Sequence, residues 1–256
     1  MCGGLLAVES ANIVGYNTVA VKGGQMNLLT VSFQTVGNAS GKATLNDVMD
    51  TTVLTSYSED GNTAGDYIDT WDMANGNWGG RYFYINQPSW NYDDVDYTDT
   101  WMNGDFEPVN PEMANGSSFW LYHSGADISA LTFAGQVGGI ASGYTLAAGQ
   151  MNLCGNPFPT VLDLTDKTQV TLTNPTSYSE DGNTAGDYID TWNLTTGNWG
   201  GRYFYINQPS WNYDDVDYSD TWMDGDFAPT STAIQAGAGF WYYAAGTGTT
   251  LTFPAL

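Results

Sequence analysis

A repeated segment limits what this chain can fold into more than any other feature of its sequence. Positions 55–71 read TSYSEDGNTAGDYIDTW and recur unchanged at 176–192, while positions 76–97 read GNWGGRYFYINQPSWNYDDVDY and recur unchanged at 197–218. Both segments return after 121 residues. A period this long fits a whole domain, because propeller blades and solenoid units repeat every ~20 to 50 residues. The chain is therefore predicted to contain two tandem copies of one module.

Looser matches on both sides of these segments set the limits of the modules. Gly24–Leu28 returns as Gly149–Leu153, and Trp101–Phe106 returns with one change as Trp222–Phe227. The sequence therefore predicts three parts, which are an N-terminal arm at 1–13, a first module at 14–137 and a second module at 138–256.

Within a module, apolar residues alternate over short runs that end at Gly, Asn, Asp or Pro, which is typical of strands and tight turns. Arg81–Asn86 alternates in this way and ends before Pro88, since proline cannot donate to a ladder. This pattern indicates an all-β chain of two β-sandwich modules, jelly-roll or immunoglobulin-like, related by internal duplication. In the first module we expect a helical turn near 46–50 and strands near 16–21, 26–33, 53–57, 66–71, 81–86, 117–123 and 128–133.

The charge balance argues against several classes of partner. The chain has 5 Lys and Arg against 28 Asp and Glu, which gives a formal net charge of −23. Nucleic acids and anionic membranes are bound through clustered Lys and Arg, and the five basic residues here are scattered. No run of eighteen apolar residues occurs, so no membrane span is expected.

The composition favours export. Lys is scarce, whereas Gly, Asn, Ser and Thr are abundant, so we expect a secreted, extracellular protein of the cell surface. Three asparagines begin N-glycosylation patterns, although chance matches are expected in such a chain and none of the three is duplicated. They are Asn38, Asn115 and Asn193.

Catalysis has little support in the sequence. His123 is the only histidine, and Ala244 occupies its position in the second module, so a duplicated histidine site is excluded. There is no nucleophile elbow, zinc motif or phosphate loop. The chain is predicted not to be an enzyme, the alternative being a glycosidase pair among its carboxylates. Cys2 and Cys154 lie far apart and are expected to be unrelated thiols, the alternative being a disulfide between them.

The arm at 1–13 suggests how copies of the chain assemble. It is apolar and follows no complete module, so the end of one chain placed against the start of the next would rebuild the internal junction. The leading hypothesis is a structural protein that self-assembles head to tail into a filament or surface fibre, the arm acting as a donor strand. The alternatives are an arm folded onto its own module and a signal-peptide remnant. The expected assembly residues are Leu5, Leu6, Val8, Ile13 and Val14.

Each module also carries two acidic turns that are rich in aromatic residues. Clustered carboxylates with Asn and backbone carbonyls are the ligands that Ca²⁺ prefers, although the spacing matches no EF-hand loop. The alternative is a set of solvated turns in which Asp and Asn cap their own backbone. No other cofactor is expected. The candidate metal ligands are Asp60, Asp66, Asp93, Asp94, Asp96, Asp181, Asp187, Asp214, Asp215 and Asp217.

Tryptophans beside these carboxylates indicate a second function. Aromatic rings stack on sugars while Asp and Asn bind hydroxyls, so the alternative to a filament is a tandem calcium-dependent, lectin-like protein whose partners are glycans. We expect Trp71 and Trp120 in the core, where aromatic rings bury much apolar surface. The candidate ligand-binding residues are Trp78, Trp90, Trp199 and Trp211.

Several short patterns resemble a known kind of protein. Val14–Asn17 followed by Gln25–Leu28, then Asp69–Trp71 and Trp101–Phe106, resembles uncharacterised secreted tandem β-module surface proteins of environmental bacteria. The likeness covers most of the chain through loose motifs and implies an extracellular β-module without a known activity. Pilus-like subunits that donate strands are an analogy of architecture only, because no pilin motif is present.

Overall fold

The computed structural model describes residues 14–38, 40, 42–58, 64–89, 95–137, 142–179, 185–210 and 216–254. Strands account for 51% of the chain and helices for 3%, and the strands form several antiparallel sheets. The prediction of an all-β fold is confirmed. None of the described helices is long and apolar enough to cross a membrane.

The first half of the chain is organised around one long sheet. Its elements are β1 (Val14–Val21), β2 (Gln25–Thr30), β3 (Lys42–Thr44), α1 (Leu45–Val48), η1 (Thr51–Val53), β4 (Tyr67–Asp72), β5 (Asn77–Gln87), β6 (Tyr97–Met102), β7 (Pro108–Val109), β8 (Glu112–Ala114), β9 (Ser118–His123) and β10 (Ile128–Gln136). Six strands form the main sheet, in the order β2-β9-β4-β5-β6-β7. The pairs β1-β10 and β3-β8 accompany it.

The second half repeats this plan in reduced form. Its elements are β11 (Ser142–Thr145), β12 (Gln150–Gly155), β13 (Leu162–Asp163), β14 (Thr171–Thr173), β15 (Tyr188–Asn193), β16 (Asn198–Ile206), β17 (Thr221–Met223), β18 (Ala233–Ile234), β19 (Gly239–Ala244) and β20 (Thr250–Phe253). The main sheet has the order β12-β19-β15-β16-β17, and β11-β20-β14 and β13-β18 form smaller sheets.

The repeated segments form equivalent hairpins, β4-β5 in the first half and β15-β16 in the second. Asp69 lies opposite Arg81 in one hairpin, and Asp190 lies opposite Arg202 in the other. Both hairpins shift register one step before the tryptophan of their first strand. The sequence repeat is therefore also a repeat of strand pairing.

The structure differs from the predicted strands at two places. The predicted strand near 53–57 is wrong, because Thr51–Val53 forms a 3-10 turn that the Asp50 side chain caps by accepting a hydrogen bond from the Thr52 N–H. Strand β6 was not predicted, because its polar first residues follow directly on an acidic turn. The helical turn expected near 46–50 is found as α1.

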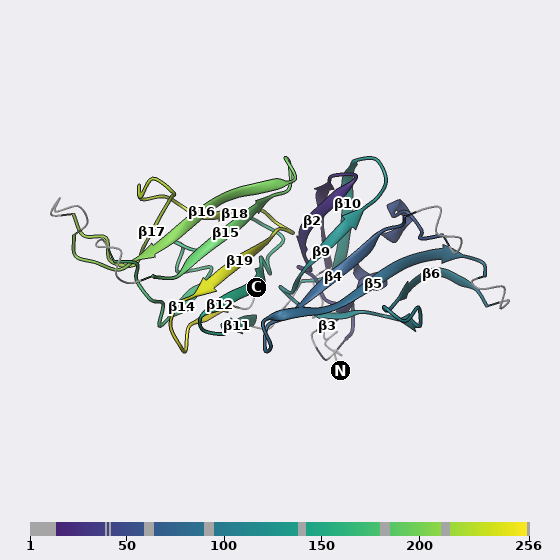
Figure 1. Cartoon of the computed structure of the whole chain (residues 1–256), viewed down its shortest axis with the longest axis horizontal. Coiled ribbons are helices and arrows are strands. Elements are labelled where there is room, and N and C mark those ends of the chain that lie inside the picture. The colour runs from purple at the N-terminus through teal and green to yellow at the C-terminus, as the bar shows by residue number, and fades with distance from the viewer. Residues whose placement is uncertain are drawn as a thin grey trace, which may run out of the picture.

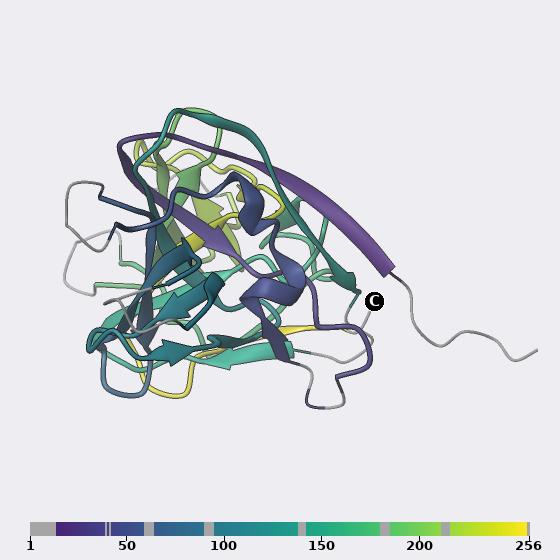
Figure 2. The same cartoon turned by 90° about the vertical axis from the view of Figure 1, so that its right-hand side faces the viewer.

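The described part of the N-terminal region is a strand within its own half. Figure 2 shows β1 as the long purple strand, which pairs antiparallel with β10. Val14 begins this strand opposite Gln136, and its side chain is 62% exposed. Outside the described residues lie the other expected assembly residues, Leu5, Leu6, Val8 and Ile13. A donor-strand role for the arm stays a prediction.

The two halves lie side by side and share one hydrophobic core. Figure 1 shows β19 of the second half next to β2 and β9 of the first. The contacts are reciprocal, because β2 touches β19 while its counterpart β12 touches β9, the counterpart of β19. Reciprocal contacts between equivalent elements are those of a local two-fold axis.

Glutamine side chains confirm the same relation at single residues. Gln25 donates from Nε2 to the Gly197 carbonyl at 2.7 Å. Its counterpart Gln150 lies against Gly76, the counterpart of Gly197, and donates to the Met73 carbonyl at 3.2 Å. The joint between the halves is therefore isologous.

Candidate functional site

Six tryptophans meet where the two halves join, and we call them the tryptophan cluster. The first half contributes Trp71, Trp78 and Trp120, and the second half contributes their counterparts Trp192, Trp199 and Trp241. Trp71 packs on Trp241 with ring centroids 4.8 Å apart, and Trp120 packs on Trp192 at 5.1 Å. The planes lie at 87° and 81°, the edge-to-face arrangement that aromatic rings prefer.

Two members of the cluster differ from the others in exposure. Trp78 and Trp199 are 57% and 55% exposed, whereas Trp120, Trp192 and Trp241 are at most 9% exposed. Trp78 lies opposite Trp71 across the hairpin, with ring centroids 5.5 Å apart. The outer rings are therefore held against inner rings of the cluster, Trp78 on Trp71 and Trp199 on Trp192, so each presents an apolar face in a fixed orientation.

An arginine–aspartate pair lies beside each exposed tryptophan. Arg81 donates from Nε and Nη2 to the two carboxylate oxygens of Asp69, at 2.7 and 2.8 Å. Arg202 binds Asp190 with the same two distances. This two-pronged geometry is the strong form of the pair. The hydrogen bond raises the pKa of both arginines.

The ring of a tyrosine lies against the face of each guanidinium. The Arg81 Cζ lies 4.1 Å from the ring centre of Tyr67, and the Arg202 Cζ lies 4.3 Å from that of Tyr188. A cation over an aromatic face is attracted to it. The charged group is thereby held in place on two sides, by a carboxylate and by a ring.

Glycines separate the tryptophan from the arginine in each hairpin. A hollow of about 410 Å³ is lined by Asp69, Trp78, Gly80 and Arg81, and its counterpart of about 440 Å³ is lined by Asp190, Trp199, Gly200, Gly201 and Arg202. Because glycine has no side chain, the floor of each hollow is backbone. A small ligand can therefore touch the indole face and the ion pair together.

A third hollow lies between these two. It measures about 350 Å³ and is lined mainly by aromatic rings of both halves, namely Trp71, Trp78, Met151, Asp190, Trp199 and Trp241. Because Trp78 and Trp199 are counterparts and both line this hollow, the local two-fold axis passes midway between them.

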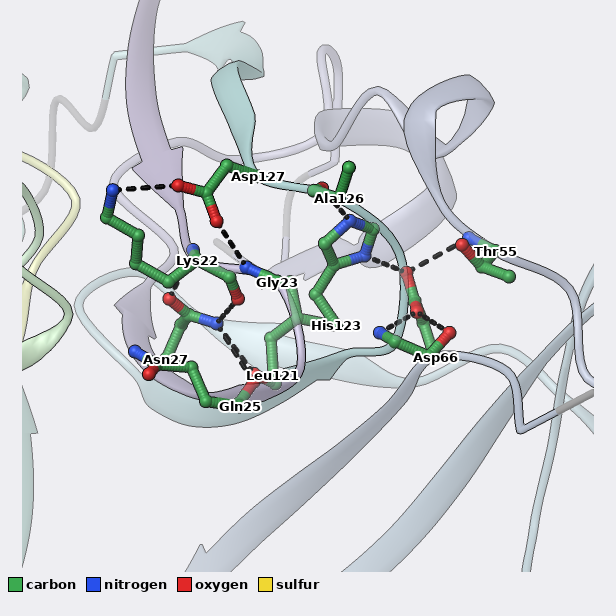
Figure 3. Close-up of polar contacts among 11 residues, drawn as sticks. Lys22, Gly23, Gln25, Asn27, Thr55, Asp66, Leu121, His123, Ala126 and Asp127 are labelled. Atoms are coloured by element: carbon green, nitrogen blue, oxygen red, sulfur yellow. Dashed lines mark hydrogen bonds and ion pairs between the residues drawn. The ribbon is translucent and has the colours of Figure 1, made fainter.

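Asp66 and Asp187, two of the predicted metal ligands, are buried and accept hydrogen bonds from residues of their own half. Figure 3 shows Asp66 accepting from the Thr55 N–H at 3.0 Å and from His123 Nδ1 at 2.7 Å, and Ser124 donates to its other oxygen. Asp187 accepts from the Tyr242 hydroxyl at 2.8 Å. Both aspartates are fully buried.

His123 is placed so that both of its ring nitrogens face acceptors. Nδ1 faces Asp66, and Nε2 lies 2.8 Å from the Ala126 carbonyl, which can only accept. Burial disfavours a charged ring, but the hydrogen bond to Asp66 and its negative charge outweigh burial and raise the pKa of His123. The ring therefore carries both protons when it satisfies both acceptors.

Of the remaining metal candidates, two accept hydrogen bonds within exposed turns and six lie outside the described residues. Asp96 accepts from Thr98, and Asp217 accepts from Ser219, two residues further along in each case. No cluster of three or more His, Cys, Asp or Glu that could hold a metal occurs among the described residues. Six candidates lie outside the described residues, namely Asp60, Asp93, Asp94, Asp181, Asp214 and Asp215.

Trp90, Trp211 and Cys2 lie outside the described residues. Cys154 is a buried free thiol, and burial raises its pKa. Each of the asparagines in glycosylation patterns is half-buried, and they are Asn38, Asn115 and Asn193.

The arginine–aspartate pairs were not singled out from the sequence. The signal was present, since Asp69 and Arg81 have opposite charges at positions that a hairpin brings face to face. Trp71 and Trp120, expected in the core of one module, pack instead between the two halves.

Comparison of the chain with protein families, with curated proteins and with solved structures finds no match. The function of the site is therefore argued from its own geometry.

Proposed function

We propose that this chain is a non-enzymatic, extracellular carbohydrate-binding protein with two equivalent sites. One site consists of Trp78 with the Arg81–Asp69 pair, and the other consists of the counterparts Trp199, Arg202 and Asp190. The observation that carries the proposal is an exposed, oriented indole beside a fixed ion pair, present twice.

The chemistry of a sugar fits these groups. A pyranose ring has an apolar face of C–H groups and a rim of hydroxyls, each of which donates and accepts. The indole of Trp78 offers the stacking surface. Arg81 keeps N–H groups that Asp69 does not use, and the carboxylate keeps free lone pairs. One hydroxyl pair can therefore donate to Asp69 and accept from Arg81.

Binding fits this site better than hydrolysis. Glycosidases need two carboxyl groups on either side of the bond that is cleaved. Among the residues that the structure describes, each outer hollow is lined by a single carboxylate, and an arginine already binds both of its oxygens. The groups can recognise hydroxyls but do not form an acid and a nucleophile.

We also infer that each half is a β-sandwich. The main sheet supplies Leu28, Ile68 and Leu121 to the same core that receives Leu131 and Phe133 from the β1-β10 pair. Two layers of strands that face one core support this assignment.

The filament and the calcium site stay predictions. An isologous contact closes on itself and does not propagate, so the joint between the halves does not favour head-to-tail growth. The proposed glycan site needs no calcium, because its polar groups are an arginine and an aspartate that satisfy each other.

A glycan array probed with wild type, Trp78→Ala, Trp199→Ala and the double variant tests the proposal. Truncating a central indole costs about 2 kcal/mol or more, roughly 30-fold in affinity per site. Each single variant should therefore keep one working site, and the double variant should lose binding.

Val161→Ala is the matched control, because it removes an exposed apolar side chain elsewhere on the surface. A double variant that is folded and still binds the array as wild type does would refute the assignment of the sites.

A further inference from the structure

We infer that the protein cross-links two neutral polysaccharide chains and holds them in opposite directions. This inference rests on the proposed function and adds the class of glycan, the valency and the orientation.

The ligand is neutral because the sites offer no unused charge. Every Lys and Arg of the sequence forms an ion pair, the pairs being Lys22–Asp127, Lys42–Glu112, Arg81–Asp69, Lys167–Asp220 and Arg202–Asp190. A uronate or sulfate ester would meet no unpaired cation and a chain of net charge −23. A cationic ligand would meet the arginine of each site. Hydroxyl groups fit a balanced ion pair, since it both donates and accepts.

The position of the local axis determines the direction of the ligands. Trp78 and Trp199 are counterparts that line the central hollow together, so the two-fold axis passes midway between the two sites. A polysaccharide has a reducing and a non-reducing end. Half a turn about the axis reverses a chain that runs across it, so a chain bound in that direction at one site is carried onto a chain at the other site with its ends exchanged. One chain crossing the hollow therefore cannot make the same contacts at both sites, but two chains in opposite directions can.

The joint between the halves makes this arrangement rigid. The two sites are connected through buried tryptophans and a common core, not through a flexible linker. A flexible linker would let both sites fold back along one chain, whereas fixed sites join separate chains. Cross-linking thus follows from the same contacts that form the cluster.

Soluble polysaccharides mixed with the full-length protein test the inference. The neutral probes are mixed-linkage β-glucan, xyloglucan and galactomannan, and the anionic probes are alginate and polygalacturonate. Gel retardation measures binding, and viscosity measures cross-linking. Wild type should bind a neutral probe and raise its viscosity, with the rise falling again at excess protein. Trp78→Ala and Trp199→Ala should each bind without raising viscosity.

The outcomes separate the inference from the proposed function. Binding of a neutral probe without any rise in viscosity would overturn cross-linking and leave glycan binding standing. A preference for alginate or polygalacturonate would overturn the neutral ligand. Failure to bind any probe, with an empty glycan array, would overturn the proposed function as well.

Orientation has its own measurement. A short oligosaccharide from the neutral polysaccharide that binds, carrying a nitroxide at its reducing end, should broaden the backbone NMR signals of the counterparts Gly80 and Gly201 equally. Broadening confined to one half would show a single chain across both sites and overturn the opposed arrangement.

Discussion

Asp66 and Asp187 are counterparts, and each is buried and needs a hydrogen-bond donor. The two halves supply that donor from different residues. Asp66 obtains its partner from His123, and Leu121 lies two residues earlier on the same strand. In the second half Ala244 replaces the histidine, and Tyr242, in the place of Leu121, donates to Asp187. A buried carboxylate without a partner is costly, so the two changes compensate each other.

This compensation predicts a rescue. His123→Ala should destabilise the protein by about 3 kcal/mol, because removing one partner of a buried pair leaves the other uncompensated. Adding Leu121→Tyr to that variant should restore most of the loss by supplying the hydroxyl that Tyr242 supplies in the second half. Chemical denaturation of the three proteins measures both steps. A double variant no more stable than His123→Ala alone would show that the aspartates are not satisfied in equivalent ways.

The same pair also predicts a pH effect. The pKa of His123 is raised in the folded state, so its contribution is complete below the unfolded value of about 6.5. The contribution is lost as the pH rises through the folded pKa. The difference in stability between wild type and the rescued double variant should therefore shift against wild type as the pH rises. An unchanged difference between acidic and alkaline pH would contradict a charged His123.

At the scale of elements, the repeated hairpins could be predicted and their surroundings could not. Side chains of a strand point to opposite faces in turn, and the residues of Arg81–Asn86 alternate with the same two-residue period. Strands β5 and β16 could therefore be predicted from the sequence. The 3-10 turn at Thr51–Val53 depends on one side-chain cap, which propensity does not reveal. The sequence predicted part of the candidate site, because Trp78 and Trp199 were expected to bind a ligand. The two arginine–aspartate pairs could not be predicted, because they depend on the register between paired strands.

The ion pairs of these hairpins yield a prediction of their own. Arg81→Ala with Arg202→Ala should weaken glycan binding at both sites while both tryptophans remain, because each hollow loses its guanidinium donors. Stability should fall by only about 1 kcal/mol per site, because each arginine side chain is about half exposed and exposed ion pairs contribute little. Gel retardation with the neutral polysaccharide measures the loss of binding, and thermal unfolding measures the stability of the variant. Unchanged binding by a folded variant would place the ligand elsewhere.

At the scale of the molecule, the reciprocal joint is the feature that sequence could not show. A sequence repeat indicates two similar parts. Whether these parts follow one another in a row or pack face to face depends on which of their surfaces are buried. Here tryptophans of the two halves pack on each other, Trp71 on Trp241 and Trp120 on Trp192. The shared core predicts that the two halves unfold together.

Calorimetry of a joint variant tests that prediction. A Cβ added at Gly155 would lie 2.2 Å from the Thr30 Oγ1 of the other half, so Gly155→Ala should destabilise the protein by about 1 to 3 kcal/mol and split its single transition in two. Gly104→Ala is the control, because a Cβ there meets open space. Two transitions already present in wild type would show that the halves are independent.

The reciprocal contacts between the two halves, β2 with β19 and β12 with β9, have a consequence for how such a chain can arise. Fusing two genes that encode a symmetric homodimer would give a chain of this kind, in which the old subunit boundary survives as an internal seam. Once both copies share one polypeptide, they no longer need to mutate in step. Leu121 and His123 in one half, against Tyr242 and Ala244 in the other, are a pair of differences of that kind.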